Sequence, residues 1–363
     1  EYTKARYLTN NKILEMSTQE TNQIEKQGDL IKFKLSEPEY NPKTYFGRTM
    51  NLLKVQNPVY SFAKSSKIEA ARKMVEEHME LEQEYQKQNK PMMVTKERAN
   101  ELRSANYLVK SSIHPDTGKI LQPWQRFCSY ALINTPFLFG MVLTKQTTTN
   151  IIFWQWINQT YNAILNYSNR NASSETGIAG VGAAYFTAVT SSIYIGLKVK
   201  KMLMPYSNKF KGPSQLIFNF IINFTAMAAA GILNSLVMRS GELKDGIHLF
   251  NADGEDTGTS PKVGREAVIK TAATRIGLAL RLFVPTLVFF VMEKRNLVPK
   301  NKMGKFFLEA TVFFGSMVFV PPMSCAVYEQ YCTVQTKDLE EKFHDLKDAE
   351  GKPITELYYN RGL

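Results

Sequence analysis

The sequence predicts an all-α, polytopic membrane protein with about five transmembrane helices, a polar re-entrant or broken helix, and a soluble helical amino-terminal region. Charge-free apolar runs in the middle of the chain reach roughly the 20 residues that a membrane-spanning helix needs. Polar residues collect toward both ends, so the mean hydropathy of -0.26 conceals the apolar middle. Between the first two apolar runs lies a segment rich in side-chain amides.

The chain divides into four parts. Residues 1–39 form a polar amino-terminal extension. Residues 40–123 form a soluble helical region, in which helices are expected to start near Ser65 and Thr95. Residues 124–328 form the transmembrane domain, with a polar loop at 239–275 where Asp253-Gly254 favours a hairpin turn. Residues 329–363 are expected to form a polar helical tail.

Five apolar runs are expected to cross the membrane, and prolines interrupt three of them. Pro136, Pro285 and Pro321 could create half-helix ends that present backbone groups to a solute. The runs are residues 127–144, 176–197, 212–238, 276–292 and 306–328.

Two of the connecting loops, at residues 198–211 and 293–305, carry an excess of lysine and arginine. The positive-inside rule places both loops on one side of the membrane. With five crossings, the amino terminus joins the basic loops and the carboxyl terminus lies opposite. If the amide-rich segment also spans, both termini lie opposite the basic loops.

The amide-rich segment, residues 153–171, carries its amides on one stripe of a helix. Side-chain amides offer donors and acceptors without net charge. On a soluble helix this would be an ordinary wet face. Between membrane-length segments, such groups are costly unless they line a cavity or find partners, which favours a re-entrant or broken helix. We name these residues the amide row: Gln155, Asn158, Gln159, Asn162 and Asn166.

A second polar stripe lies on the third apolar run, where Asn219, Asn223 and Asn234 share one helix face. Two stripes on different helices are consistent with a shared hydrated path. They are equally consistent with hydrogen bonds between helices, worth about 0.6 to 2 kcal/mol each.

Several function classes lack support. The net charge of +12 comes without a lysine- and arginine-rich tract interleaved with aromatics, so no nucleic-acid partner is expected. Three cysteines and four histidines show no metal-ligand spacing, and we expect neither a metal site nor a cofactor. No nucleotide loop or hydrolase motif is present, so we expect no enzyme. The run His114, Pro115, Asp116, Thr117, Gly118 has the composition of a structural turn.

The chain resembles the sideroflexins, a family of the mitochondrial inner membrane. The matching segments run in order from about residue 40 to the end. They are TYFGR (44–48), AARKMV (70–75), HPDTG (114–118), the amide-rich segment, MRSGELKDGI (238–247), DGEDTG, PPMSCA (321–326) and the terminal YYNRGL.

The resemblance implies a multi-pass protein that transports serine, or alanine, glycine or cysteine, in support of one-carbon metabolism. Neutral amides can pair with the ammonium, carboxylate and hydroxyl groups of serine without trapping it by strong ion pairs. The substrate path would combine the amide row with Asn219, Asn223 and Asn234, and membrane lipids would surround the helices.

The alternative is a structural role, because some sideroflexins are tied to assembly of the respiratory NADH dehydrogenase. The chain would then be an accessory or assembly subunit that binds other subunits of a respiratory complex. Two features favour this alternative: the extension at residues 1–39, and Lys119 where the family usually has glutamate.

Overall fold

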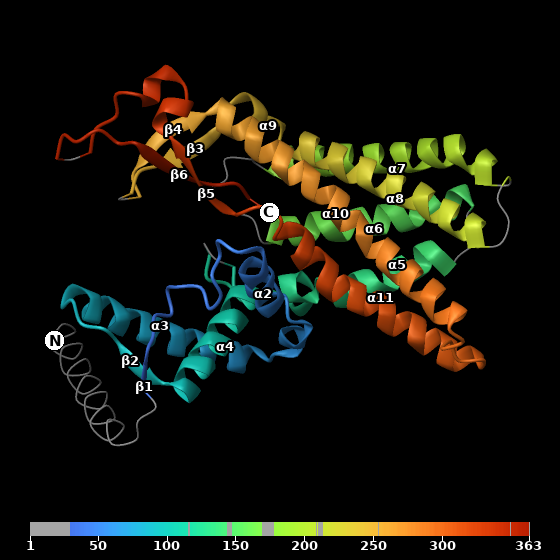
Figure 1. The fold of residues 1–363 in the computed structure, drawn as a ribbon, viewed down its shortest axis with the longest axis horizontal. Coiled ribbons are helices and arrows are strands. Elements are labelled where there is room, and N and C mark those ends of the chain that lie inside the picture. The colour runs from blue at the N-terminus through green and yellow to red at the C-terminus, as the bar shows by residue number, and fades with distance from the viewer. Residues whose placement is uncertain are drawn as a thin grey trace.

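The computed structural model describes residues 30–114, 117–143, 147–168, 178–207, 209, 213–252, 254–348 and 350–362. It contains an amino-terminal helical unit, a bundle of long helices and a small sheet unit (Figure 1). The described chain is mostly helical, as predicted. The expectation of a purely α-helical protein is wrong, because a two-stranded and a four-stranded sheet are present.

The amino-terminal unit contains α2 (Tyr45–Val55), the 3-10 helix η1 (Pro58–Phe62), α3 (Ser65–Lys87) and α4 (Lys96–Ser112). The helices expected near Ser65 and Thr95 are confirmed. The Thr95 hydroxyl caps α4 by accepting a hydrogen bond from Arg98 N at 3.2 Å. A short antiparallel sheet pairs β1 (Leu30–Lys32) with β2 (Met93–Thr95). Buried Ile68 and Leu102 belong to the apolar clusters that hold α3 against α4.

Six long helices of the described chain form the bundle, and they run in alternating directions (Figure 1). Each helix packs against the next along the chain, and α11 packs back against α5, which closes a ring. Short 3-10 turns, η2 (Pro123–Gln125) and η3 (Phe127–Ser129), lead into the first helix. The six are α5 (Tyr130–Leu143), α6 (Thr148–Ser168), α7 (Ile178–Ser207), α8 (Pro213–Met238), α10 (Pro261–Lys294) and α11 (Lys302–Cys325).

The outer surface of the ring is apolar. Two of the described helices, α10 and α11, are long and apolar enough to cross a membrane. Only 18% of the most apolar window of α10 is buried, whereas the core helix of a soluble protein would be mostly covered. The exposed side chains of α10 follow helical spacing and form a stripe suited to lipid. They are Ile276, Leu280, Val284, Leu287 and Val291, between 36% and 48% exposed.

The amide-rich segment and the three interrupting prolines behave differently from the expectation. Helix α6 is continuous over 21 residues, so a broken helix at this place is wrong. Its length of about 31 Å is enough to span a bilayer. Pro136, Pro285 and Pro321 each lie inside a continuous helix and create no half-helix ends.

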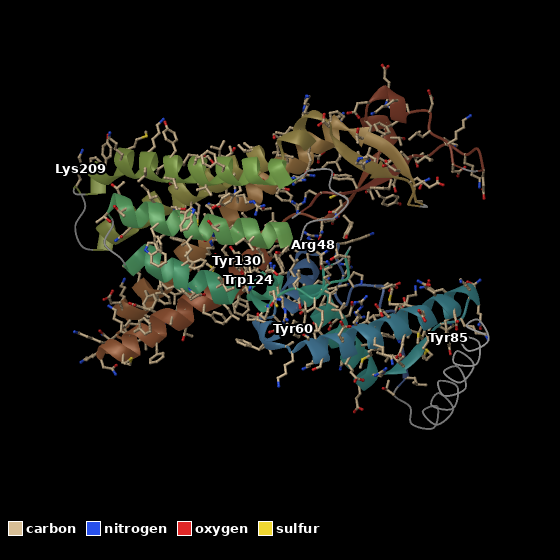
Figure 2. The ribbon with its side chains drawn as sticks, turned by 180° about the vertical axis from the view of Figure 1, so that it is seen from behind. Arg48, Tyr60, Tyr85, Trp124, Tyr130 and Lys209 are labelled. Atoms are coloured by element: carbon tan, nitrogen blue, oxygen red, sulfur yellow. The ribbon has the colours of Figure 1, made fainter. Side chains whose placement is uncertain are left out.

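The bundle has two distinct ends. The carboxyl-terminal ends of α7 and α10, which carry basic residues of the two expected loops, lie at the same end of the bundle (Figure 1). The amino-terminal unit and the sheet unit lie at the other, and Figure 2 shows Lys209 far from Arg48 and Tyr85. The basic ends of α7 and α10 therefore share one end of the bundle, and the amino-terminal and sheet units share the other.

The sheet unit overturns the expectation of a helical tail at residues 329–363. Its four antiparallel strands are ordered β4-β3-β6-β5. Along β6, Leu357 and Tyr359 are buried and their neighbours are exposed, which is the two-residue period of a half-buried strand. The elements are α9 (Ser240–Lys244), β3 (Ile247–Phe250), β4 (Asp256–Ser260), β5 (Tyr331–Gln335), η4 (Thr336–Asp338), η5 (Glu341–Phe343) and β6 (Glu356–Asn360). The predicted hairpin is confirmed as β3–β4.

The sheet unit is fastened to the start of α10. The Ser260 hydroxyl accepts from Val263 N at 3.2 Å and donates to the Glu340 carboxylate at 2.7 Å. The same carboxylate accepts from Lys262 N at 3.1 Å. Burial alone would raise the pKa of Glu340, but these hydrogen bonds outweigh it and hold the pKa below its ordinary value. Strand β4 therefore leads directly into α10, with Ser260 as the helix cap.

Segments that carry the family resemblance contact one another in pairs. Arg48 of TYFGR donates from Nε to Ala326 O at 2.7 Å, and the Tyr45 hydroxyl donates to Met323 O at 3.1 Å. These bonds attach α2 to the PPMSCA end of α11. Arg72 of AARKMV donates to Gly118 O at 3.0 Å, which holds the HPDTG turn. These segments therefore join distant parts of the chain.

The terminal YYNRGL segment is pinned by Arg361, which is fully buried. Its Nε donates to Glu329 O at 2.8 Å and its Nη1 donates to Thr271 Oγ1 at 3.1 Å. Arg239 of MRSGELKDGI donates to the Arg361 carbonyl at 2.7 Å. The residue that follows β6 is thus tied to α10 and to the start of α9.

We predict that Arg361→Ala lowers the melting temperature of the detergent-purified protein by several degrees, because it leaves buried carbonyls unpaired at a cost of about 1 to 3 kcal/mol each. Arg361→Lys should recover only part of the loss, since an ammonium cannot reproduce the guanidinium fork. Lys352→Ala, at an exposed position in the same unit, is the control. A melting temperature equal to that of the control would contradict the pinning role.

Candidate functional site

The amide row lies mostly on a flank of α6. Asn158 is 5% exposed and faces the interior, whereas Gln155, Gln159 and Asn162 are half-buried. The most buried face also carries Tyr161 and Leu165, roughly a quarter turn from the centre of the row. The side chain of Asn166 lies outside the described residues. Of the described row, the structure brings only Asn158 to the interior face.

The second stripe is described only at Asn234, since the side chains of Asn219 and Asn223 lie outside the described residues. Asn234 is half-buried, and its Oδ1 is buried without a hydrogen-bond partner among the described residues. On the same helix, Gly231 lies close to Arg275 of α10: a Cβ at Gly231 would lie 3.2 Å from Arg275 Cβ. The described part of this stripe is therefore near the α8–α10 seam, and α7 packs against both α6 and α8.

The HPDTG run forms a turn in its described part. Gly118 N donates to His114 O at 3.0 Å, and Gly118 has φ of 64°, a conformation that favours glycine. Thr117 N donates to His114 Nδ1 at 3.4 Å, while Pro115 and Asp116 lie outside the described residues. These contacts agree with the structural interpretation of the run.

The ring encloses a polar cluster where α5, α10 and α11 meet. Arg281 of α10 is 8% exposed and donates from Nη1 to the Tyr130 hydroxyl of α5. Its guanidinium also lies over the Tyr130 ring, 5.9 Å from the centroid. Ser316 of α11 donates to the Arg281 carbonyl at 2.7 Å, and Asn134 Nδ2 donates to Tyr130 O at 2.9 Å. Figure 2 shows Tyr130 toward the end of the bundle that faces the amino-terminal unit.

Helix α6 adds Tyr161 to this interior. The rings of Tyr161 and Phe137 of α5 lie 5.9 Å apart. Tyr161 and Tyr130 lie on α6 and α5, which pack against each other. We call Tyr130, Asn134, Tyr161 and Arg281 the interior cluster. Three of its atoms are buried without a hydrogen-bond partner among the described residues: Asn134 Oδ1, Tyr161 Oη and Arg281 Nε.

A pocket of about 740 Å³ lies elsewhere, between α2, the start of α10 and the sheet unit. Its charged groups pair with one another: Arg48 lies 3.4 Å from Glu329, and Lys270 pairs with Glu266. None of the residues that line it belongs to the amide row or to the interior cluster. The pocket and the buried unpartnered atoms of the interior cluster therefore lie in different places. The interior cluster is the better candidate site, because buried polar atoms without hydrogen bonds need a partner, whereas the charged groups of an open pocket can be hydrated.

Two residues of the interior cluster could have been identified from the sequence, although the amide row is the more prominent pattern. Arg281 is a charged residue within an apolar run, and an ionisable residue in a membrane segment marks a candidate functional site by default. Asn134 likewise interrupts the first apolar run. Tyr161 gave no such signal, because its burial follows from the order of helices in the ring.

Known proteins resemble this chain over nearly its whole length. The model of the family described as Sideroflexins matches residues 34–363. Sideroflexin-5 of Homo sapiens is 30% identical over 339 residues, which cover 92% of this chain and 94% of that protein. Sideroflexin of Dictyostelium discoideum is 30% identical over 329 residues, covering 90% and 96%. A sideroflexin of Saccharomyces cerevisiae is 29% identical over 333 residues, covering 91% and 97%. No solved structure matches.

We predict that Gly140→Ala destabilises the α5–α6 seam that positions the interior cluster. An added Cβ would lie 2.1 Å from the Trp154 ring, and such overpacking typically costs about 1 to 3 kcal/mol. Trp154→Phe should rescue the variant, and a double-mutant cycle on melting temperatures measures the coupling. Gly315→Ala on α11, where an added Cβ meets open space, is the control. Additive effects of the two substitutions would refute the contact.

Proposed function

We propose that this chain, which belongs to the sideroflexin family, is a carrier of the mitochondrial inner membrane for a small zwitterionic amino acid of the serine type. One observation carries the proposal: a ring of helices with an apolar outer face encloses buried polar atoms without described partners. Such atoms are costly in apolar surroundings unless water or a solute pairs with them. A carrier supplies that partner during each transport cycle.

The proposed topology has six crossings, formed by α5, α6, α7, α8, α10 and α11. Continuous α6 supports this count, as does the position of the basic ends of α7 and α10 at the end opposite the amino-terminal and sheet units. The basic loops would face the negative side of the membrane. The inner-membrane location comes from the family resemblance alone.

The proposed path keeps the residues predicted from the sequence and adds the interior cluster. Asn158 supplies a neutral amide at the interior face, and Gln155, Gln159 and Asn162 border it. Asn166, Asn219 and Asn223 remain proposed members of the path. Asn234 contributes an acceptor near α10. Neutral amides suit a carrier, because a bound zwitterion must also be released.

An accessory role in a respiratory-chain complex remains the second candidate, because the amino-terminal unit exposes large apolar side chains. Phe46 is 67% exposed, Val59 is 69% exposed and Phe62 is 77% exposed. Apolar side chains in such a group often mark a surface covered by a partner or by a membrane.

Uptake of radiolabelled serine into proteoliposomes tests the carrier. The wild-type chain should accumulate serine, and the Asn158→Leu/Asn162→Leu variant should lose uptake by roughly tenfold or more, because two amides of the path become apolar. Phe153→Leu/Trp156→Leu changes two exposed residues of the same helix and should keep most of the activity. Unchanged uptake in the asparagine variant would remove the amide row from the mechanism.

Native separation after extraction in mild detergent distinguishes the two candidates. A carrier should migrate alone or as a small oligomer. A subunit should co-migrate with a respiratory complex at a fixed ratio and should be released when Phe46 and Phe62 are replaced by serine. Co-migration together with absent serine uptake would favour the accessory role.

A further inference from the structure

Among the three buried arginines of the described chain, Arg281 makes the fewest side-chain hydrogen bonds. The Arg126 guanidinium, 2% exposed, donates to the carbonyls of Leu121, Tyr60, Ser61 and Ala63. Arg361 is saturated in the same way by carbonyls and by the Thr271 hydroxyl. Arg281 has one side-chain hydrogen bond, to the Tyr130 hydroxyl, and its Nε has no partner among the described residues. Arg126 and Arg361 each donate at least three hydrogen bonds from their side chains, and Arg281 differs from both.

The charge of Arg281 also lacks a counterion within the described chain. No described carboxylate lies within ion-pair distance of its guanidinium. Arginine stays protonated in proteins, so it cannot escape the cost of burial by losing its proton. Arg275, six residues earlier on the same helix, is a second arginine of α10. The interior therefore favours an anionic group.

The neutral members of the interior cluster complement that preference. Asn134 is 2% exposed, and its Nδ2 is already used by the Tyr130 carbonyl, so its free atom is the acceptor Oδ1. Tyr161 Oη is a second buried atom that can accept a hydrogen bond. Two buried acceptors within the bundle that also encloses an arginine suit a ligand that carries both an ammonium group and a carboxylate. That arrangement is the one common to all α-amino acids.

We propose that Arg281 binds the carboxylate of the transported amino acid and that Asn134 and Tyr161 accept hydrogen bonds from its ammonium group. The inference rests on the proposed function and assigns its substrate-recognition residues. Guanidinium and carboxylate form paired, charge-assisted hydrogen bonds, with the unpartnered Nε as one donor. Tyr130 holds the guanidinium in the absence of ligand and competes with the carboxylate, which assists release. Serine, alanine and glycine share the two recognised groups, and an amine without a carboxylate does not.

Equilibrium binding of radiolabelled serine to the detergent-purified full chain, with serinamide as competitor, tests the assignment. Serinamide keeps the ammonium and hydroxyl groups but lacks the carboxylate, so it should compete poorly against the wild type. Arg281→Gln should weaken serine binding about 10- to 100-fold and abolish the preference over serinamide. Arg281→Lys should keep part of both, because it retains the charge without the fork. Lys198→Gln, which removes an exposed positive charge on α7, should change neither.

Melting temperatures show whether each variant folds, and the Arg281→Lys result decides the matter if Arg281→Gln does not. Serine uptake is measured on the same preparations. Folded Arg281 variants that keep both wild-type affinity and the preference for serine would overturn the assignment while leaving the carrier intact. Serine binding without uptake would overturn the carrier and leave the binding site. A wild-type chain that neither binds nor moves serine would overturn both.

Discussion

A guanidinium enclosed by apolar helices is the constraint on which the architecture of the bundle depends. Arg281 cannot lose its charge, and its side chain is only 8% exposed. The closure of α11 against α5 brings Tyr130 and Ser316 to the two sides of this residue. The contacts of Arg281 therefore depend on the closed ring, and a change that opens the α5–α11 seam should disturb them.

Arginines also hold the amino-terminal unit and the sheet unit in place, by hydrogen bonds to backbone carbonyls. Arg48, Arg126 and Arg361 each donate to several backbone carbonyls at the ends of helices or in the connections between elements. Their hydrogen bonds satisfy the buried carbonyls and the guanidinium together, which makes them rigid joints. The segments of family resemblance fall largely at these joints. The amide-rich segment lies instead in α6 of the bundle.

Much of the fold follows from local sequence. Apolar runs without charge predicted the long helices, and Asp253-Gly254 predicted the β3–β4 hairpin. The tail was wrong because its acid-rich composition suggested a helix, although Leu357 and Tyr359 alternate with exposed residues as a strand requires. The prolines were expected to break the helices, but Pro136 and Pro285 lie within continuous helices. Proline is tolerated there because contacts with neighbouring helices compensate for the missing backbone hydrogen bond.

The candidate site was harder to predict than the fold. The amides of α6 could be placed on one stripe from their spacing, but the direction of that stripe depends on which helices flank α6. The ring order turns Tyr161 inward and leaves most of the amide row on the flank. Arg281 and Asn134 were visible as polar residues in apolar runs, yet their proximity arises from contacts between helices that are distant in sequence. The spacing of residues along the sequence does not show which distant helices contact one another.

The most direct test of the central claim is whether solute reaches the interior cluster of the folded protein in a bilayer. An Asn134→Cys variant without the three native cysteines, reconstituted in liposomes, can be treated with a small water-soluble thiol reagent. The account predicts that Cys at position 134 is modified, that serine protects it and that serinamide does not. A position that resists the reagent in functional protein, or reacts equally with and without serine, would contradict the account.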